Sequence, residues 1–249
     1  MAQASTSSRL HASRLVRALS DLAAPDMAGS QKHFARRLGA MIDLSDSIRL
    51  SLLLAGLNGL PFKPDVAGPA SIKKAFIKQR EAIVKSILKA CIPGASSTRI
   101  RFPAIDESTP ASEAMECKPF RAFYAAQQSE LDFRIRRLQI DLRRDIAGIS
   151  PELARLVKLD EILLETTGAQ ARKHFTKVPA LLEQRFAQHL KHYREQVSGT
   201  DYQYNLWAAQ LKQLRDEIQT LLLAEADTRL LPLMGLLEAL DDHTEQKPL

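Results

Sequence analysis

Apolar residues recur along most of this chain every three or four positions, the period that places them on one side of an α-helix. The clearest case begins at Pro119, after which neither Gly nor Pro recurs before Gly148. Six apolar residues there fall in one narrow stripe: Tyr124, Leu131, Ile135, Leu138, Leu142 and Ile146. No segment alternates cleanly over the length of a strand. The pattern therefore predicts an all-α fold, a multi-helix bundle.

The helix after Pro119 also carries apolar residues away from its main stripe. Phe133 and Ile140 project to nearly the opposite side, which predicts a central helix covered on two faces. Arg137 and Arg144 share this second face, so their guanidinium groups either reach solvent or bind a partner. A solvated face is favoured, because three acid–base pairs have i,i+4 spacing. These pairs are Glu130 with Arg134, Asp132 with Arg136, and Arg137 with Asp141.

Three more helices are predicted in the C-terminal half, which makes this half a bundle of long helices. Their expected bounds are Pro151 to Gly168, Val178 to Val197, and Tyr204 to the Ala-rich region at Ala224. Ser150 is placed to cap the first of them. Pro232 is expected to break or kink the last segment, because proline has no backbone N–H to donate.

The N-terminal half is predicted to form helices over residues 9–22, 30–38, 43–57 and 70–91. The last of these is amphipathic. Its apolar line consists of Ile72, Phe76, Ile83 and Ile87, widened by Ile77, Val84 and Leu88. Its far side carries Lys74, Lys78, Lys85 and Lys89. Glu81 is the one acidic residue of this helix, so local ion pairs cannot neutralise the lysines.

Three interpretations of the lysine stripe remain open. The first is an ordinary solvated face. The second is contact with the phosphates of a nucleic acid, which would be sequence-independent and salt-dependent. The third is binding to an acidic protein or an anionic lipid surface. The candidate binding residues, for nucleic acid or another acidic partner, are Lys74, Lys78, Lys85, Lys89, Arg137 and Arg144.

Charge and composition predict a division of the chain. The net charge is +6, and residues 1–117 hold 16 Lys and Arg against 10 Asp and Glu, whereas residues 118–249 are neutral. Residues 92–118 lack apolar periodicity and are rich in Pro, Gly and Ser. We therefore expect a basic N-terminal helical region over 1–91, an exposed flexible linker over 92–118, and a C-terminal helical bundle over 119–249.

Few features of the sequence point to catalysis. It contains no phosphate-binding loop, zinc-protease or hydrolase signature, so we expect no enzyme activity, no small-molecule substrate and no cofactor. His189, His192 and Glu195 have a spacing that suits a metal, but a solvated helix face is the favoured interpretation, because a metal site needs more ligands. Cys91 either has a lowered pKa beside the basic helix or is a buried thiol.

Two further features bear on location. Two cysteines are too few for a disulfide framework, which agrees with a reducing compartment. No window has the length and apolarity of a membrane-spanning helix, and the first residues lack the apolar core of a secretory signal. These features predict a cytoplasmic protein.

Four stretches of the chain carry a resemblance to a known family. They are FARRLGAMIDLSDSIRLSLL from Phe34, SPELARLVKLDEILLETT from Ser150, VPALLEQRF from Val178 and MGLLEAL from Met234. Together they resemble a family of helical proteobacterial proteins that is similar to the F component of type III Zorya anti-phage defence. The resemblance implies a cytoplasmic component that acts with a proton-driven, stator-like membrane motor. It implies either a nucleic-acid-binding effector or sensor, or a helical adaptor for companion defence proteins.

Overall fold

The computed structural model describes residue 51 and residues 62–64, 68–94, 99–175, 178–197 and 202–246. Within these ranges it contains six helices and no strand, so the predicted all-α fold is confirmed. The helices are α4 (Pro69–Ala90), α5 (Ala111–Ala114), α6 (Lys118–Ala147), α7 (Pro151–Phe175), α8 (Val178–Gln196) and α9 (Tyr204–Gln246). The helices predicted over 9–22, 30–38 and 43–57 lie, apart from Ser51, outside the described residues.

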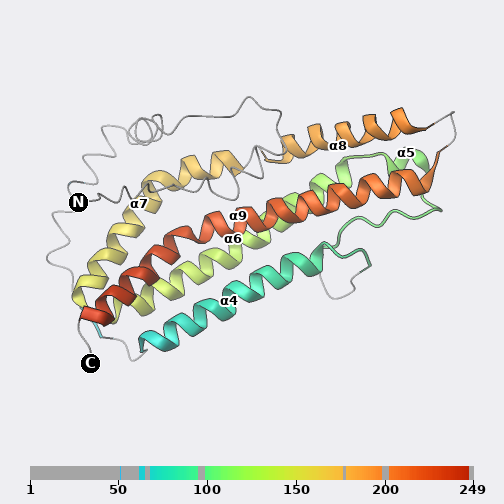
Figure 1. The fold of residues 1–249 in the computed structure, drawn as a ribbon. Coiled ribbons are helices and arrows are strands. Elements are labelled where there is room, and N and C mark those ends of the chain that lie inside the picture. The colour runs from blue at the N-terminus through green and yellow to red at the C-terminus, as the bar shows by residue number, and fades with distance from the viewer. Residues whose placement is uncertain are drawn as a thin grey trace, which may run out of the picture.

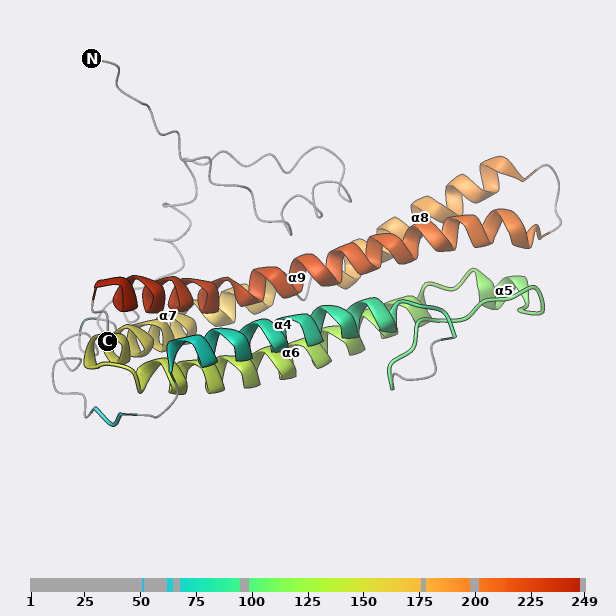
Figure 2. The ribbon, with the colours of Figure 1, turned by 60° about the horizontal axis from the view of Figure 1, so that its bottom comes forward.

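The helices form an elongated bundle in which α4, α6 and α9 lie side by side (Figure 1). α7 and α8 follow one another along the bundle, and each contacts both α6 and α9. Figure 2 shows α4 beside α6 and α9 from a second direction. α9 has 43 residues and, at about 1.5 Å per residue, is about 65 Å long. It contacts each of the other long helices, so it is the element on which they are assembled.

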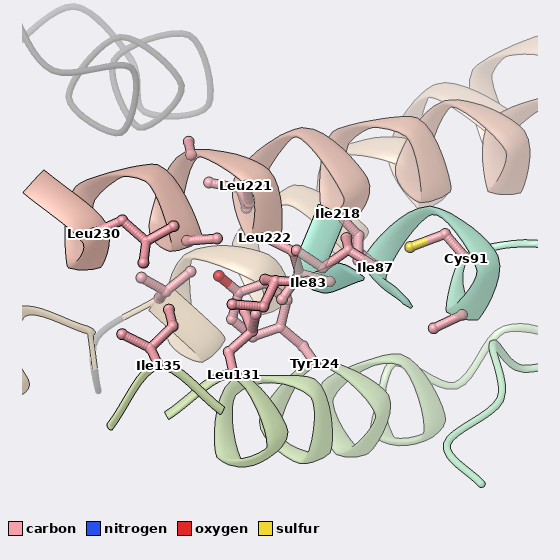
Figure 3. Close-up of a cluster of buried hydrophobic side chains, with 14 of the residues drawn as sticks. Ile83, Ile87, Cys91, Tyr124, Leu131, Ile135, Ile218, Leu221, Leu222 and Leu230 are labelled. Atoms are coloured by element: carbon pink, nitrogen blue, oxygen red, sulfur yellow. The ribbon is translucent and has the colours of Figure 1, made fainter. Parts of the chain in front are cut away.

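The hydrophobic core lies where α4, α6 and α9 meet. Figure 3 shows Ile83 from α4, Leu131 from α6 and Leu222 from α9 pointing toward one another. All six residues of the stripe predicted for α6 are buried, as are the four residues of the predicted apolar line of α4. Burying each Leu or Ile side chain contributes about 2 kcal/mol, so these stripes supply the main force that aligns the helices.

The apolar side of α4 is narrower than predicted. Ile77 is 56% exposed and Leu88 is 37% exposed, although both were expected to widen the buried line. The reason is that they lie beside the contact with α9, where α4 presents ion-pairing side chains instead of apolar ones.

Two predicted helix ends are wrong. The N-cap of α7 is confirmed, because the Leu153 amide donates to Ser150 Oγ over 3.2 Å, but α7 continues beyond Gly168 to Phe175. α9 likewise continues through Pro232 to Gln246. Glycine costs a helix only about 1 kcal/mol, and proline about 3 kcal/mol. In α9 that cost is offset by leucines buried on both sides of Pro232, namely Leu230, Leu233, Leu236 and Leu240.

The segment between α4 and α6 is partly packed into the core. Phe102 and Ala114 are buried, and the Phe102 ring lies edge-on to Phe120, with ring centroids 5.5 Å apart. The Trp207 indole donates to the Ala114 carbonyl over 2.8 Å. The expectation that residues 92–118 are exposed is therefore wrong at these two positions, because a few apolar side chains suffice to anchor a segment without periodicity. The division into 1–91, 92–118 and 119–249 stays a prediction, although α4 shares one core with α6 and α9.

Candidate acidic-partner interface

The six cations of α4 form two groups on different sides of the helix. Lys73 forms an ion pair with Asp241 of α9. Arg80 donates to Asp227 of the same helix, with 3.1 Å between Arg80 Nη2 and Asp227 Oδ1. The other four cations lie on the side of α4 away from the core and form what we call the lysine face: Lys74, Lys78, Lys85 and Lys89. The contact with α9 thus takes up two of the six charges and leaves four.

The lysine face is turned to solvent. All four of its residues are exposed, and they span about 22 Å along the helix axis. Lys85 Nζ lies 3.3 Å from Glu81 Oε2 in an exposed pair. No acidic partner of Lys74, Lys78 or Lys89 occurs among the described residues. The predicted placement of these lysines away from the core is confirmed, and their ligand stays a prediction.

The arginines of α6 are largely neutralised within the chain. Arg134 Nε lies 2.5 Å from Glu130 and Arg136 Nη2 lies 2.7 Å from Asp132, so two of the three predicted i,i+4 pairs are confirmed. A further arginine, Arg143, is buried and donates from Nε and Nη2 to Asp160 of α7 over 2.8 and 2.6 Å.

The third predicted pair on α6 is not formed. Asp141 lies 3.5 Å from Arg144, which also contacts Asp145 at 2.9 Å. Arg137 consequently has no acidic partner in the part of the chain that the structure describes. Of the two candidate arginines, Arg137 therefore has a charge available to a ligand, and Arg144 is already paired.

The second apolar face of α6 is uncovered by the described residues. Phe133 is 64% exposed and Ile140 is 67% exposed, so the expectation of a helix covered on two faces is wrong here. α4, α7 and α9 all pack against the other sides of α6, where the main stripe lies. Arg137 and Arg144 do share the exposed side with these two residues, as predicted.

One hollow gathers positive charge from three parts of the chain. It lies between the C-terminal half of α4 and α6, and has a volume of about 430 Å³. Lys85 and Lys89 line it together with Arg99 and Arg134. Glu130, the acidic residue among its lining, is the partner of Arg134. Sequence reasoning missed Arg99 and Arg134 as members of this site, because only the packing of α4 on α6 brings them beside the lysine face.

His189 is a buried structural residue. The favoured interpretation of a solvated helix face is wrong for it, since its Nδ1 lies 3.0 Å from Gln210 Oε1 and its Nε2 lies 3.0 Å from Glu217 Oε2. Arg185 completes a bidentate pair with the same carboxylate. Burial alone would raise the pKa of Glu217, but hydrogen bonds from His189 and Arg185 outweigh it and lower this pKa to about 2. The group therefore joins α8 to α9.

Cys91 is a buried thiol at the end of α4, which confirms the second of the two interpretations given to it. Figure 3 shows its sulfur beside the core of the bundle. Burial raises its pKa to about 12, and the nearby Arg215 offsets only part of this effect. A thiol that stays protonated is neither a nucleophile nor a metal ligand.

Neither a metal centre nor a membrane span is found among the described residues. No three His, Cys, Asp or Glu side chains there are grouped so that they could hold an ion. None of the described helices is long and apolar enough to cross a bilayer.

Comparison with known proteins assigns most of the chain to a family. Residues 1–242 match a family model, DUF3348, whose description is "protein of unknown function". No curated protein and no solved structure matches the chain.

Proposed function

We propose that this chain, which belongs to the DUF3348 family of proteins of unknown function, is a helical protein without catalytic activity that binds duplex nucleic acid through the lysine face of α4. The lysine face supplies contacts to phosphates, and Arg99 extends it toward α6, where Arg134 is already paired with Glu130. Such contacts position a protein on a duplex without reading its sequence.

The observation that supports this proposal is the division of charge on α4. Two cations pair with acidic residues of α9, and four are exposed with Glu81 as their one acidic neighbour. A helix that needed charge only for solubility would gain as much from mixed signs, whereas four lysines on one face, with Glu81 as the one carboxylate beside them, favour a polyanion. The absence of an aromatic residue among them favours a duplex over stacked single strands.

The resemblance to the F component of type III Zorya systems suggests the setting for this activity. We place the chain in the cytoplasm, as a component of anti-phage defence that acts with companion proteins and a stator-like membrane motor. In that setting, sequence-independent binding would let an effector or sensor respond to invading nucleic acid of any sequence.

A helical adaptor that touches no nucleic acid is the second candidate function. The exposed Phe133 and Ile140 favour it, because large apolar side chains on a surface are typical of protein contacts. The two functions differ in whether the purified chain binds nucleic acid at all.

Fluorescence anisotropy with a labelled 30-base-pair duplex of random sequence separates the two. We expect the chain to bind at low salt, and a variant with Lys74, Lys78, Lys85 and Lys89 all replaced by Gln to bind at least tenfold more weakly. The control replaces four lysines elsewhere by Gln, namely Lys118, Lys158, Lys191 and Lys212, so both variants have the same net charge. Equal losses of duplex affinity in both variants would show a non-specific effect of charge. If the wild type does not bind the duplex even at low salt, the adaptor function is favoured instead.

A further inference from the structure

The structure contains a second surface whose chemistry differs from that of the lysine face. It is an open groove between α4 and α6, with a volume of about 380 Å³. Its α4 wall includes Ala75, Gln79 and Ala82, and its α6 wall includes Phe133 and Arg137. These α4 residues are exposed, as are Phe133 and Arg137. We call this surface the α4–α6 groove.

Both walls of the groove repeat every seven residues. Ala75 and Ala82 are seven residues apart on α4, and Phe133 of the α6 wall is followed seven residues later, on the same side of α6, by the exposed Ile140. Seven residues are two turns of a helix, so each wall presents similar side chains at about 10 Å intervals. A third helix laid along the groove has the same period, and its side chains would fit between those of the walls as in a coiled coil. The alanines leave room for its close approach.

The charges around the groove point to an acidic occupant. The α6 wall also includes Arg144 with its partners Asp141 and Asp145, and Arg134, which pairs with Glu130, so these charges are neutralised within the chain. Arg137 lies between Phe133 and Ile140 along α6 and has no acidic partner among the described residues. Lys78 lies three residues after Ala75 and four before Ala82, so it borders the α4 wall and is likewise without an acidic partner there.

We propose that the α4–α6 groove binds an amphipathic helix of a partner protein, with an apolar stripe flanked by Asp and Glu. Its apolar side chains pack on Phe133, Ile140 and the two alanines. Its carboxylates pair with Arg137 and Lys78. The groove extends over residues 72–83 of α4 and 133–145 of α6, which matches a helix of three to four turns. This binding goes beyond the proposed nucleic-acid contact, because it uses the exposed apolar side chains Phe133 and Ile140, although Lys78 belongs to both surfaces.

A synthetic peptide tests the proposal with the full chain. The probe is an 18-residue labelled helix with Leu at heptad a and d positions and Glu at the flanking positions; a matched peptide has Lys in place of each Glu. We expect the acidic peptide to bind, the basic peptide to bind at least tenfold more weakly, and F133S/I140S to weaken acidic-peptide binding at least tenfold. Arg137→Gln should weaken it severalfold. The control L231S/M234S removes two exposed apolar residues from α9 and should change nothing.

Several outcomes would overturn the proposal. One is acidic-peptide binding that is unchanged in F133S/I140S, and another is equal binding of the basic peptide. A photo-crosslinker at position 133 (Phe133→p-benzoylphenylalanine) that joins to residues 1–61 of the same chain, or to a second copy, would assign the groove to another occupant. Phosphatidylglycerol vesicles that bind through Phe133 and Ile140, with no binding of the peptide, would assign the face to a membrane. Unchanged duplex binding by F133S/I140S keeps this test separate from the proposed function.

Discussion

α4 and α6 are both rich in basic residues, but they differ in how many of these residues form ion pairs within the chain. On α6, Arg134 and Arg136 pair with carboxylates one turn earlier, and Arg143 pairs with Asp160 of the neighbouring helix. On α4, the pairing is confined to the side facing α9, apart from the exposed Lys85–Glu81 contact. The number of basic residues on a helix therefore says little about binding. What matters is how many of those charges the fold itself neutralises.

Breaking a buried pair on α6 should have the largest effect on stability. Arg143→Met leaves the Asp160 carboxylate, whose side chain is only 19% exposed, without its partner. We expect the free energy of unfolding to fall by about 3 kcal/mol, since an uncompensated buried charge is costly. The matched control is Arg136→Met on the same helix, whose pair is exposed, and it should cost less than about 1 kcal/mol. Equal losses in urea denaturation would contradict the distinction between the two pairs.

The second-largest loss of stability is expected on acidification, through Glu217 at the contact between α8 and α9. Because the pKa of Glu217 falls from 4.5 to about 2 on folding, its ionised form stabilises the folded chain above pH 4.5. That contribution is lost as the pH drops from about 4.5 to about 2. The fall in pKa corresponds to about 3 kcal/mol, which solvent screening of the 22% exposed Glu217 side chain reduces to about 2 kcal/mol. Glu217→Gln should therefore flatten the pH dependence of the unfolding free energy in this window. The exposed control Glu195→Gln should retain the full dependence, and an identical pH profile for both variants would rule out this assignment.

The smallest effect on stability is expected on the lysine face. Replacing its four lysines by Gln removes charges that are exposed and, except at Lys85, unpaired within the described residues. The unfolding free energy should change by less than about 1 kcal/mol, because exposed charges contribute little. Thermal unfolding followed by circular dichroism measures this. A loss of unfolding free energy as large as that from Arg143→Met would mean that the lysines stabilise the fold. Weaker nucleic-acid binding by this variant would then not show that the lysines contact the nucleic acid.

Local patterns in the sequence predicted what depends on residues within one helix. The buried stripes of α4 and α6, the Ser150 cap and the Glu130–Arg134 pair all follow from spacings of three or four residues, and all are confirmed. Contacts between helices could not be predicted in this way. Asp227 lies 147 positions from its partner Arg80, and the pairing of His189 with Glu217 likewise needs the packing of two helices.

The same limit explains the errors on the exposed face of α6. Periodicity showed that Phe133 and Ile140 share a side, but whether that side is covered depends on where the other helices lie. Likewise the sequence does not show which arginine pairs with Asp141, because Asp141 is within about one turn of both Arg137 and Arg144. The candidate residues could be identified from the sequence, whereas their division into paired and unpaired charges required the fold.

The salt dependence of duplex binding tests the central claim most directly, because it counts the phosphates that the chain contacts. If the lysine face makes four such contacts, a plot of log affinity against log salt concentration should have a slope of about −3.6. The variant with Lys118, Lys158, Lys191 and Lys212 replaced by Gln should keep that slope. The variant that lacks the four lysines of α4 should lose most of that slope. Equal slopes for the two variants would contradict the claim that the unpaired charges of α4 are the ones that bind.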